Sequence, residues 1–236
     1  MKTISSRHNA VYKRVRDAMR DHDAEIVIEG PKMISDAIRA GWEPALVVRR
    51  APSADGETAN FVFTPEIFDA LADTRTSQGV LAVFPRPASQ DVFARRESIV
   101  VALDGVQDPG NVGTIVRLAA AFDASGIALL PGCADPFSPK AIRASAGAVL
   151  NVPIASIGYG ELDGHTLYAA DGTGEATEPP ARDAVLIFGS EGAGVSSQLR
   201  ERAKRIAIAM SGRVESLNVA AAAAILLSRS FALRTS

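Results

Sequence analysis

Short apolar runs alternate with helical segments from Ile99 to Ser236. The apolar runs predict strands at residues 99–103, 127–130, 152–155, 167–170, 185–188 and 206–209. The patterns between them predict helices at residues 112–122, 139–150, 197–203 and 217–233. Because strands that alternate with helices form parallel sheets covered on both faces, this part of the chain predicts an α/β domain with a mainly parallel sheet.

A smaller α/β pattern occupies residues 1–84. It predicts strands at residues 24–29, 45–48, 61–63 and 80–84, helices at residues 31–41 and 64–71, and a polar turn at residues 52–60. Residues 85–98 contain prolines and many polar side chains, which is typical of a connecting segment. The sequence therefore predicts one domain at residues 1–84, a linker at residues 85–98 and a second domain at residues 99–236.

The charge of the chain is unevenly distributed. The 25 basic and 27 acidic residues give a net charge of −2, which by itself argues against a nucleic-acid partner. Residues 1–20, however, hold six basic side chains and one acidic one. Val11, Val15 and Met19 recur at spacings of four and predict the buried stripe of a helix. The basic face of that helix has two interpretations, an ordinary solvated surface and a phosphate-binding surface. The two are compatible in one helix.

Composition excludes several kinds of site. Cys133 is the only cysteine, so no intramolecular disulfide can form, which fits a cytoplasmic protein. One thiol and three scattered histidines predict no Cys/His metal site. No run of 18 uncharged apolar residues occurs, so no membrane partner is expected. We interpret Cys133 as a small residue at a strand end.

The loops after the strands of the second domain are expected to carry the chemistry, because ligands of parallel sheets bind beyond the carboxyl ends of the strands. Three of these loops, at residues 104–113, 189–194 and 210–218, combine glycines with polar side chains. Glycine allows close approach to a ligand, and helix N-termini offer unpaired N–H groups. The chain lacks both the P-loop pattern and the dinucleotide-binding fingerprint, so a different ligand crevice is predicted.

The same loops carry an ordered set of motifs. They read Asn111-x-Gly113-x-x-x-Arg117, Gly189-x-Glu191-x-x-Gly194 and Ser216-Leu217-Asn218-Val219-Ala220. In order and spacing they resemble the three motifs of SpoU/TrmH-type RNA ribose 2′-O-methyltransferases of the SPOUT class. Residues 138–148 also resemble the family's stretch between the first two motifs, and residues 1–84 resemble its ribosomal-protein-like substrate-binding domain.

The resemblance implies a fold, a cofactor and an assembly. The sheet would contain a trefoil knot, and two copies would form a homodimer. S-adenosylmethionine would bind in the knot against Gly189, Ile208 and Leu217, with Ala170 and Thr173 bordering it.

The resemblance also implies catalytic and RNA-binding residues. Arg117 would be catalytic, with Asn111, Glu191, Ser216 and Asn218 orienting it and the ribose; Glu191 is a candidate ion-pair partner of Arg117. A guanidinium with a pKa above about 12 is a poor base, so we expect Arg117 to hold the target phosphate. The candidate RNA-binding residues are Arg7, Asn9, Lys13, Arg14 and Arg143.

The substrate expected from the resemblance is ribosomal RNA. Transfer RNA is the alternative substrate, and a non-catalytic RNA-binding protein with a degenerate methyltransferase domain is the alternative function. The intact motif residues, Asn111 and Arg117 among them, argue against that second alternative.

Overall fold

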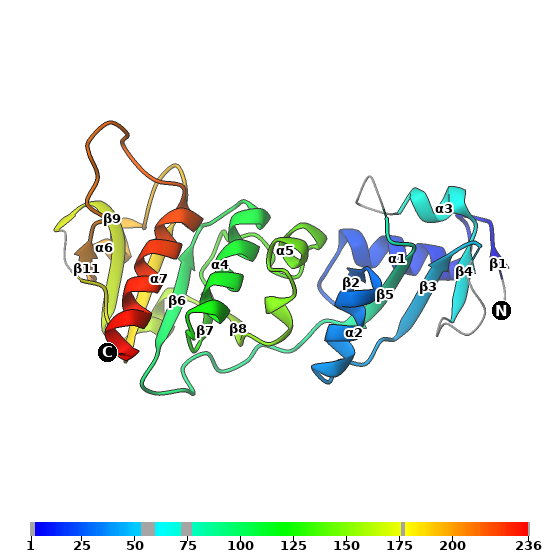
Figure 1. Cartoon of the computed structure of the whole chain (residues 1–236), viewed down its shortest axis with the longest axis horizontal. Coiled ribbons are helices and arrows are strands. Elements are labelled where there is room, and N and C mark those ends of the chain that lie inside the picture. The colour runs from blue at the N-terminus through cyan, green and yellow to red at the C-terminus, as the bar shows by residue number, and fades with distance from the viewer. Residues whose placement is uncertain (1–2, 53–59, 72–76, 176–177, 236) are drawn as a thin grey trace. The chain divides into compact units, whose positions relative to one another are not determined.

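The chain divides into two compact units in the computed structural model, which describes residues 3–52, 60–71, 77–175 and 178–235 (Figure 1). One unit comprises Met1–Pro87 with Phe137–Ile142, and the other comprises Ala88–Pro136 with Arg143–Ser236. Lys2, one of the basic residues counted above, and residues 53–59 of the polar turn lie outside the described residues.

The first unit contains a five-stranded mixed sheet in the order β1-β4-β3-β5-β2. In this sheet β1, β4 and β3 run parallel to one another, and β5 is antiparallel to both β3 and β2. The strands are β1 (Thr3–Ile4), β2 (Glu25–Glu29), β3 (Leu46–Arg50), β4 (Phe61–Phe63) and β5 (Val80–Pro85). The helices are α1 (Ala10–Arg20), α2 (Pro31–Arg39) and α3 (Pro65–Asp69).

Helix α1 buries a different stripe from the predicted one. Its buried residues are Tyr12, Val15 and Ala18, whereas Val11 and Met19 are only partly buried. A strict spacing of four advances about 40° per step around a helix of 3.6 residues per turn, so it drifts off the buried face. The Tyr12 ring lies 6.0 Å from that of Phe63, centroid to centroid, inside the core of this unit.

The second unit contains a six-stranded sheet in the order β11-β9-β10-β6-β7-β8, and every neighbouring pair is parallel. The strands are β6 (Ile99–Asp104), β7 (Gly126–Leu129), β8 (Ile154–Ser156), β9 (Leu167–Glu175), β10 (Ala184–Gly189) and β11 (Lys204–Ile206). The predicted α/β class with a parallel sheet is confirmed. β9 ends five residues later than predicted, so Ala170 lies inside the strand and not at its end.

Helices α4 (Pro109–Ala121) and α7 (Val219–Thr235) pack next to each other beside this sheet (Figure 1). The unit also contains α6 (Ser197–Arg200) and 3₁₀ turns at Ala148–Leu150 and Tyr159–Leu162, and α5 (Pro139–Ala144) crosses the division between the two units after Ile142. The single helix predicted at residues 139–150 is wrong. Ala146 and Gly147 adopt φ values of 50° and 86°, and this left-handed backbone ends the α-helix.

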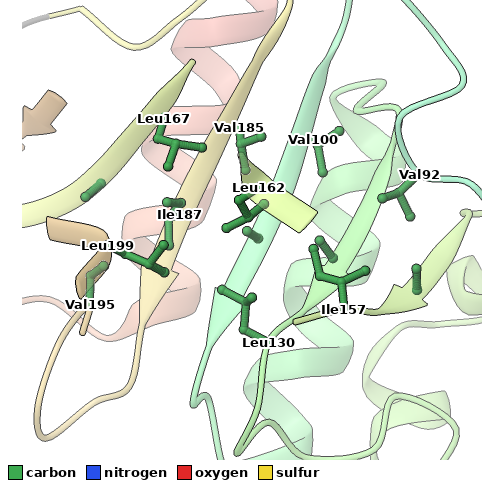
Figure 2. Packing of buried hydrophobic residues seen from close by; sticks show 14 residues of the cluster. Val92, Val100, Leu130, Ile157, Leu162, Leu167, Val185, Ile187, Val195 and Leu199 are labelled. Atoms are coloured by element: carbon green, nitrogen blue, oxygen red, sulfur yellow. The ribbon is translucent and has the colours of Figure 1, made fainter. Parts of the chain in front are cut away.

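The segment expected to be a linker is partly built into the second unit. Val92 is 1% exposed and belongs to the apolar cluster under the sheet, where it packs with residues such as Val100 and Ile157 (Figure 2). Its carbonyl accepts a hydrogen bond from the Ser125 hydroxyl at 2.9 Å. The polar, proline-bearing composition of the segment concealed this apolar anchor.

We expect Val92→Ala to lower the free energy of unfolding by about 2 kcal/mol, because it removes two buried carbon groups and leaves a cavity. Ile38→Ala is the control, since Ile38 is 50% exposed. Urea unfolding followed by circular dichroism measures both. Equal stabilities of the two variants would show that Val92 is not a core residue.

Candidate active site

A cavity of about 420 Å³ lies beside the middle of β9 and at the carboxyl ends of β10 and β11. Its lining includes Ala170, Gly189, Ile208 and Leu217, four of the five residues expected to contact the cofactor. Thr173, the fifth, is exposed and is not among the lining residues. Because β9 continues to Glu175, it carries Thr173 beyond the cavity wall, where its hydroxyl donates to the Asp171 carboxyl at 2.8 Å.

The loop after β10 folds back onto the end of its own strand. A Cβ atom on Gly189 would lie 2.0 Å from the carbonyl carbon of Gly194 and 2.1 Å from the nitrogen of Val195. The backbone N–H of Gly194 donates to the carbonyl of Ser190 at 2.9 Å and closes the loop. Glycine at position 189 is therefore required by close approach of backbone to backbone.

The three motifs meet in one hydrogen-bond network. The side-chain amide of Asn111 donates to Glu191, and the amide of Asn218 donates to the Asn111 carbonyl oxygen at 3.2 Å. Helix capping fixes the positions of both asparagines. Asp108 caps α4 by accepting from the Asn111 backbone N–H at 3.0 Å, and Asn218 caps α7 by accepting from the N–H of Ala220 at 2.9 Å. The start of α7 at Val219, two residues later than predicted, follows from this cap.

The remaining candidate catalytic residues have different surroundings. Ser216 lines the cavity together with Glu191. Arg117 is exposed on α4, and it has no hydrogen-bond or ion-pair partner within the described ranges. The expected ion pair between Glu191 and Arg117 is absent from these ranges, because the Glu191 carboxyl accepts from Asn111. Arg117 is thus available to a ligand.

A buried polar cluster supports the loop from beneath. Asp104, 4% exposed, ends β6 beside Gly189 of β10. One of its carboxyl oxygens accepts from the Tyr159 hydroxyl at 2.9 Å, and the other accepts from the backbone N–H of Ser196 at 2.7 Å. Asp104 therefore ties the end of the Gly189 loop to the sheet. The role of Asp104 could not be predicted from the sequence, since Tyr159 and Ser196 lie 55 and 92 residues away. The local signal was a carboxyl group at the end of an apolar strand.

Two titratable groups beside Asp104 are held protonated. Burial, the hydrogen bond to Asp104 and its negative charge raise the pKa of the Tyr159 hydroxyl. Burial also raises the pKa of the Cys133 thiol, which donates to the Leu103 carbonyl at 3.1 Å. A protonated, partly buried thiol is a poor nucleophile, so the structure agrees with a strand-end role for Cys133.

Asp171 places an anionic group on the cavity wall. Burial opposes its ionisation, but hydrogen bonds from Thr173 and the charges of Arg200 and Arg205 outweigh burial and lower the pKa of the carboxyl. One carboxyl oxygen accepts from the backbone and hydroxyl of Thr173. The other is buried and has no hydrogen-bond partner in the described part of the chain.

The candidate RNA-binding residues are placed as follows. Arg7 and Lys13 are exposed, and Asn9 caps α1 by accepting from the Val11 backbone at 2.8 Å. Arg14 donates to both carboxyl oxygens of Glu25. Arg143, in the second unit, is half-buried and has an interaction partner of its own.

The described residues offer neither a metal cluster nor a membrane-spanning helix. Across residues 3–52, 60–71, 77–175 and 178–235, no group of three or more His, Cys, Asp or Glu side chains is arranged to hold a metal ion. Over the same ranges no helix has the length and apolarity needed to cross a membrane.

Comparison with known proteins decides the family. A family model described as the SpoU rRNA Methylase family matches residues 98–228, more than half of the chain. The chain belongs to the SpoU rRNA methylase family. The predicted resemblance is confirmed, and with it the enzyme class and cofactor: a methyltransferase that uses S-adenosylmethionine.

Relatives of this SpoU protein match it over nearly its whole length. A 23S rRNA guanosine 2′-O-methyltransferase of Bacillus subtilis is 31% identical, over 96% of this chain and 98% of its own. An uncharacterized tRNA/rRNA methyltransferase of a Synechocystis strain is 29% identical, over 95% of this chain and 92% of its own. The crystal structure of an AdoMet-bound rRNA methyltransferase from Sinorhizobium meliloti is 28% identical, with a TM-score of 0.83 over 97% of each chain. Both units of the SpoU protein therefore have counterparts in that structure.

The cavity of the SpoU protein fits S-adenosylmethionine in its chemistry. The cofactor carries a positive sulfonium and an ammonium group, and the wall carries the carboxyls of Asp171 and Glu215. The unpartnered buried oxygen of Asp171 is an acceptor that a cationic ligand would satisfy. Ile208 and Leu217 supply apolar surface suited to an adenine ring, and the glycines of the 189–194 loop allow close approach.

We expect Gly189→Ala to abolish binding of S-adenosylmethionine, because its Cβ would displace the backbone at Gly194 and Val195. Gly192→Ala is the control in the same loop, since a Cβ there meets open space. Isothermal titration calorimetry measures both affinities. Wild-type affinity in Gly189→Ala would mean that the loop does not shape the cofactor site.

We expect Asp104→Ala to weaken S-adenosylmethionine roughly tenfold, because it releases the loop end at Ser196 and forfeits hydrogen bonds to a carboxyl group. Ser125→Ala is the control for stability alone, since it also removes a buried hydrogen bond but at the amino end of β7. Thermal unfolding should shift in both variants. An equal loss of cofactor affinity in Ser125→Ala would contradict a positioning role for Asp104.

Proposed function

We propose that this protein transfers the methyl group of S-adenosylmethionine to a ribose 2′-hydroxyl of ribosomal RNA. The observation that carries the proposal is the Glu191–Asn111–Asn218 network, which joins one polar residue from each of the three motifs at the cavity's edge. The B. subtilis relative, named as a 23S rRNA 2′-O-methyltransferase, supports ribosomal RNA as the substrate.

The chain's own residues have to position the ribose and stabilise charge. The bound cofactor supplies an electrophilic methyl group. Alignment of a nucleophile with such a group can contribute roughly 7–11 kcal/mol of barrier reduction. The Asn111 amide, fixed by Glu191 and Asn218, is suited to orient the ribose. Arg117, exposed and without a partner in the described ranges, is suited to hold the target phosphate and offset the charge of the forming alkoxide.

We assign RNA binding to the first unit, with Arg7 and Lys13 as its main phosphate contacts, because both are exposed. Asn9 and Arg14 contribute less in this proposal, since the Asn9 carbonyl oxygen caps a helix and the Arg14 guanidinium is paired with Glu25. Arg143 is the phosphate candidate in the second unit. These residues act as a local basic surface in a chain whose net charge is −2.

The proposal includes a homodimer, a trefoil knot, no metal ion and a cytoplasmic location. The apolar side chain of Val214, which is exposed in the loop before α7 and does not line the cofactor cavity, supports a covering second copy. Support for the knot comes from α7, which returns after this loop to pack against α4 and β10. The single cysteine supports the cytoplasmic location, because secreted proteins usually carry disulfides.

The proposed reaction is tested with unmodified 23S rRNA and radiolabelled S-adenosylmethionine. The label should enter RNA and block alkaline cleavage at one nucleotide, as expected when the 2′-hydroxyl is methylated. Label in a base, or none in RNA, would contradict the proposal. Mapping ribose methylations lost in a deletion strain then identifies the nucleotide.

Transfer RNA is the second candidate substrate, favoured by the name of the Synechocystis relative, a tRNA/rRNA methyltransferase. The same assay with unmodified tRNA discriminates the two. A protein that only binds RNA would show no calorimetric heat with S-adenosylmethionine.

We expect Arg117→Ala to lower kcat by roughly 100- to 1000-fold, the usual effect of removing a donor that stabilises developing charge. Affinity for S-adenosylmethionine should be unchanged, because Arg117 does not line the cavity. Arg182→Ala, at another exposed arginine of the same unit, is the control. A wild-type kcat in Arg117→Ala would contradict the catalytic role assigned to Arg117.

A further inference from the structure

A second concentration of positive charge lies in the methyltransferase unit. Residues 200–205 contain Arg200, Arg202, Lys204 and Arg205 against one acid, Glu201, and all four basic side chains are exposed. Residues 98–236 as a whole hold 11 basic and 13 acidic residues. Four of the 11 basic residues thus fall within six positions of a unit whose formal charge is negative. We call these four residues the basic edge.

The fold places the basic edge beside the cofactor cavity. Arg200 ends α6 and lines the cavity, and Lys204 and Arg205 belong to β11. β11 is the outermost strand of the sheet and is paired with β9 alone in the described structure (Figure 1). A strand of RNA that brings a ribose to the cavity can therefore cross this edge.

The charges of the basic edge are only partly compensated. Arg202 pairs with Asp163. The Lys204 ammonium lies 5.5 Å from the centre of the Tyr168 ring, and Arg205 reaches the Thr173 hydroxyl at 3.5 Å. Within the described ranges neither Lys204 nor Arg205 has a carboxyl group at ion-pair distance.

Charged side chains on an outer strand have another known use, which is to block pairing with a further strand. That use concerns side chains on the strand itself, whereas Arg200 and Arg202 of the basic edge lie outside β11. The basic edge is almost uniformly positive, although acidic residues outnumber basic ones in the unit. Phosphate binding accounts for the sign as well as the position.

We propose that the basic edge, at Lys204 and Arg205 in particular, holds backbone phosphates of the RNA strand whose ribose enters the cofactor cavity. This inference rests on the proposed RNA methyltransferase function. Arginine and lysine bind phosphate without reading bases, so this edge fixes the path of the strand and adds affinity.

The test compares two double variants by RNA affinity and salt dependence. Lys204→Gln with Arg205→Gln removes two positive charges, and Lys204→Glu with Arg205→Glu reverses them. A fluorescent 15-nucleotide poly(U) strand reports binding by anisotropy between 50 and 200 mM salt. Each lost phosphate contact should lower affinity about fivefold near 0.1 M salt and reduce the salt slope by about 0.7. The reversed variant should bind most weakly.

Matched controls separate this role from others. Arg96→Gln with Arg182→Gln removes the same charge from exposed positions that precede β6 and β10, at the opposite end of these strands. That control should keep the wild-type affinity and salt slope. Affinity for S-adenosylmethionine should be unchanged in the Arg96→Gln/Arg182→Gln control and in Lys204→Gln alone, because none of these residues lines the cavity. The Arg205 variants are left out of that comparison, since the charge of Arg205 acts on Asp171 of the cavity wall.

Two outcomes would overturn the proposal. If the glutamate variant binds RNA like the wild type while the glutamine variant aggregates, the edge serves only to block strand pairing. If the control loses as much affinity as the glutamine variant, the effect is one of net charge. Methyl transfer to 23S rRNA is measured separately on the wild type, so loss of the proposed function and loss of the basic edge give different results.

Discussion

The candidate site depends on one close contact between two stretches of backbone. Strand β10 ends at Gly189, and the chain turns back so tightly that Gly194 and Val195 occupy the space of a side chain at that position. This turn places Glu191 at the cavity edge, and the buried carboxyl of Asp104 holds the far end of the turn at Ser196. A loop pinned at both ends loses little conformational freedom when a ligand binds, which favours affinity.

The Asn111 side chain couples this loop to two helices. A side-chain amide can donate and accept at once, so Asn111 donates its N–H to Glu191 and accepts from Asn218 with its carbonyl oxygen. An aspartate could not donate to Glu191, and a lysine could not accept from Asn218. Since Asp108 and Asn218 also cap α4 and α7, the helix starts and the site are set by the same residues.

The sequence was sufficient for the parallel sheet and for the residues that meet at its carboxyl edge, because strand period and loop composition are local signals. Contacts at long range escaped it. The role of Asp104 requires knowing that Tyr159 and Ser196 come to it from distant loops. The family resemblance placed Thr173 at the cofactor, but β9 continues past its predicted end at residue 170 and carries Thr173 beyond the cavity wall. Where β9 ends depends on its pairing with β11, which is not a local property of the sequence. The burial of Val92 was not predicted either, because its neighbours in the sequence are polar and are typical of a linker.

The basic residues that are available to RNA also depend on the fold and not on the sequence alone. A count along the chain finds the basic segment at residues 1–20, but it also counts Arg14, whose guanidinium is occupied by Glu25. The count for residues 98–236 is close to neutral and conceals the basic edge, whose importance comes from its position on β11 beside the cavity. Phosphates respond to charge within about one Debye length, roughly 10 Å at 0.1 M salt. Net charge over 236 residues therefore says little about RNA binding, whereas a few exposed cations beside a cofactor cavity can set the path of a strand.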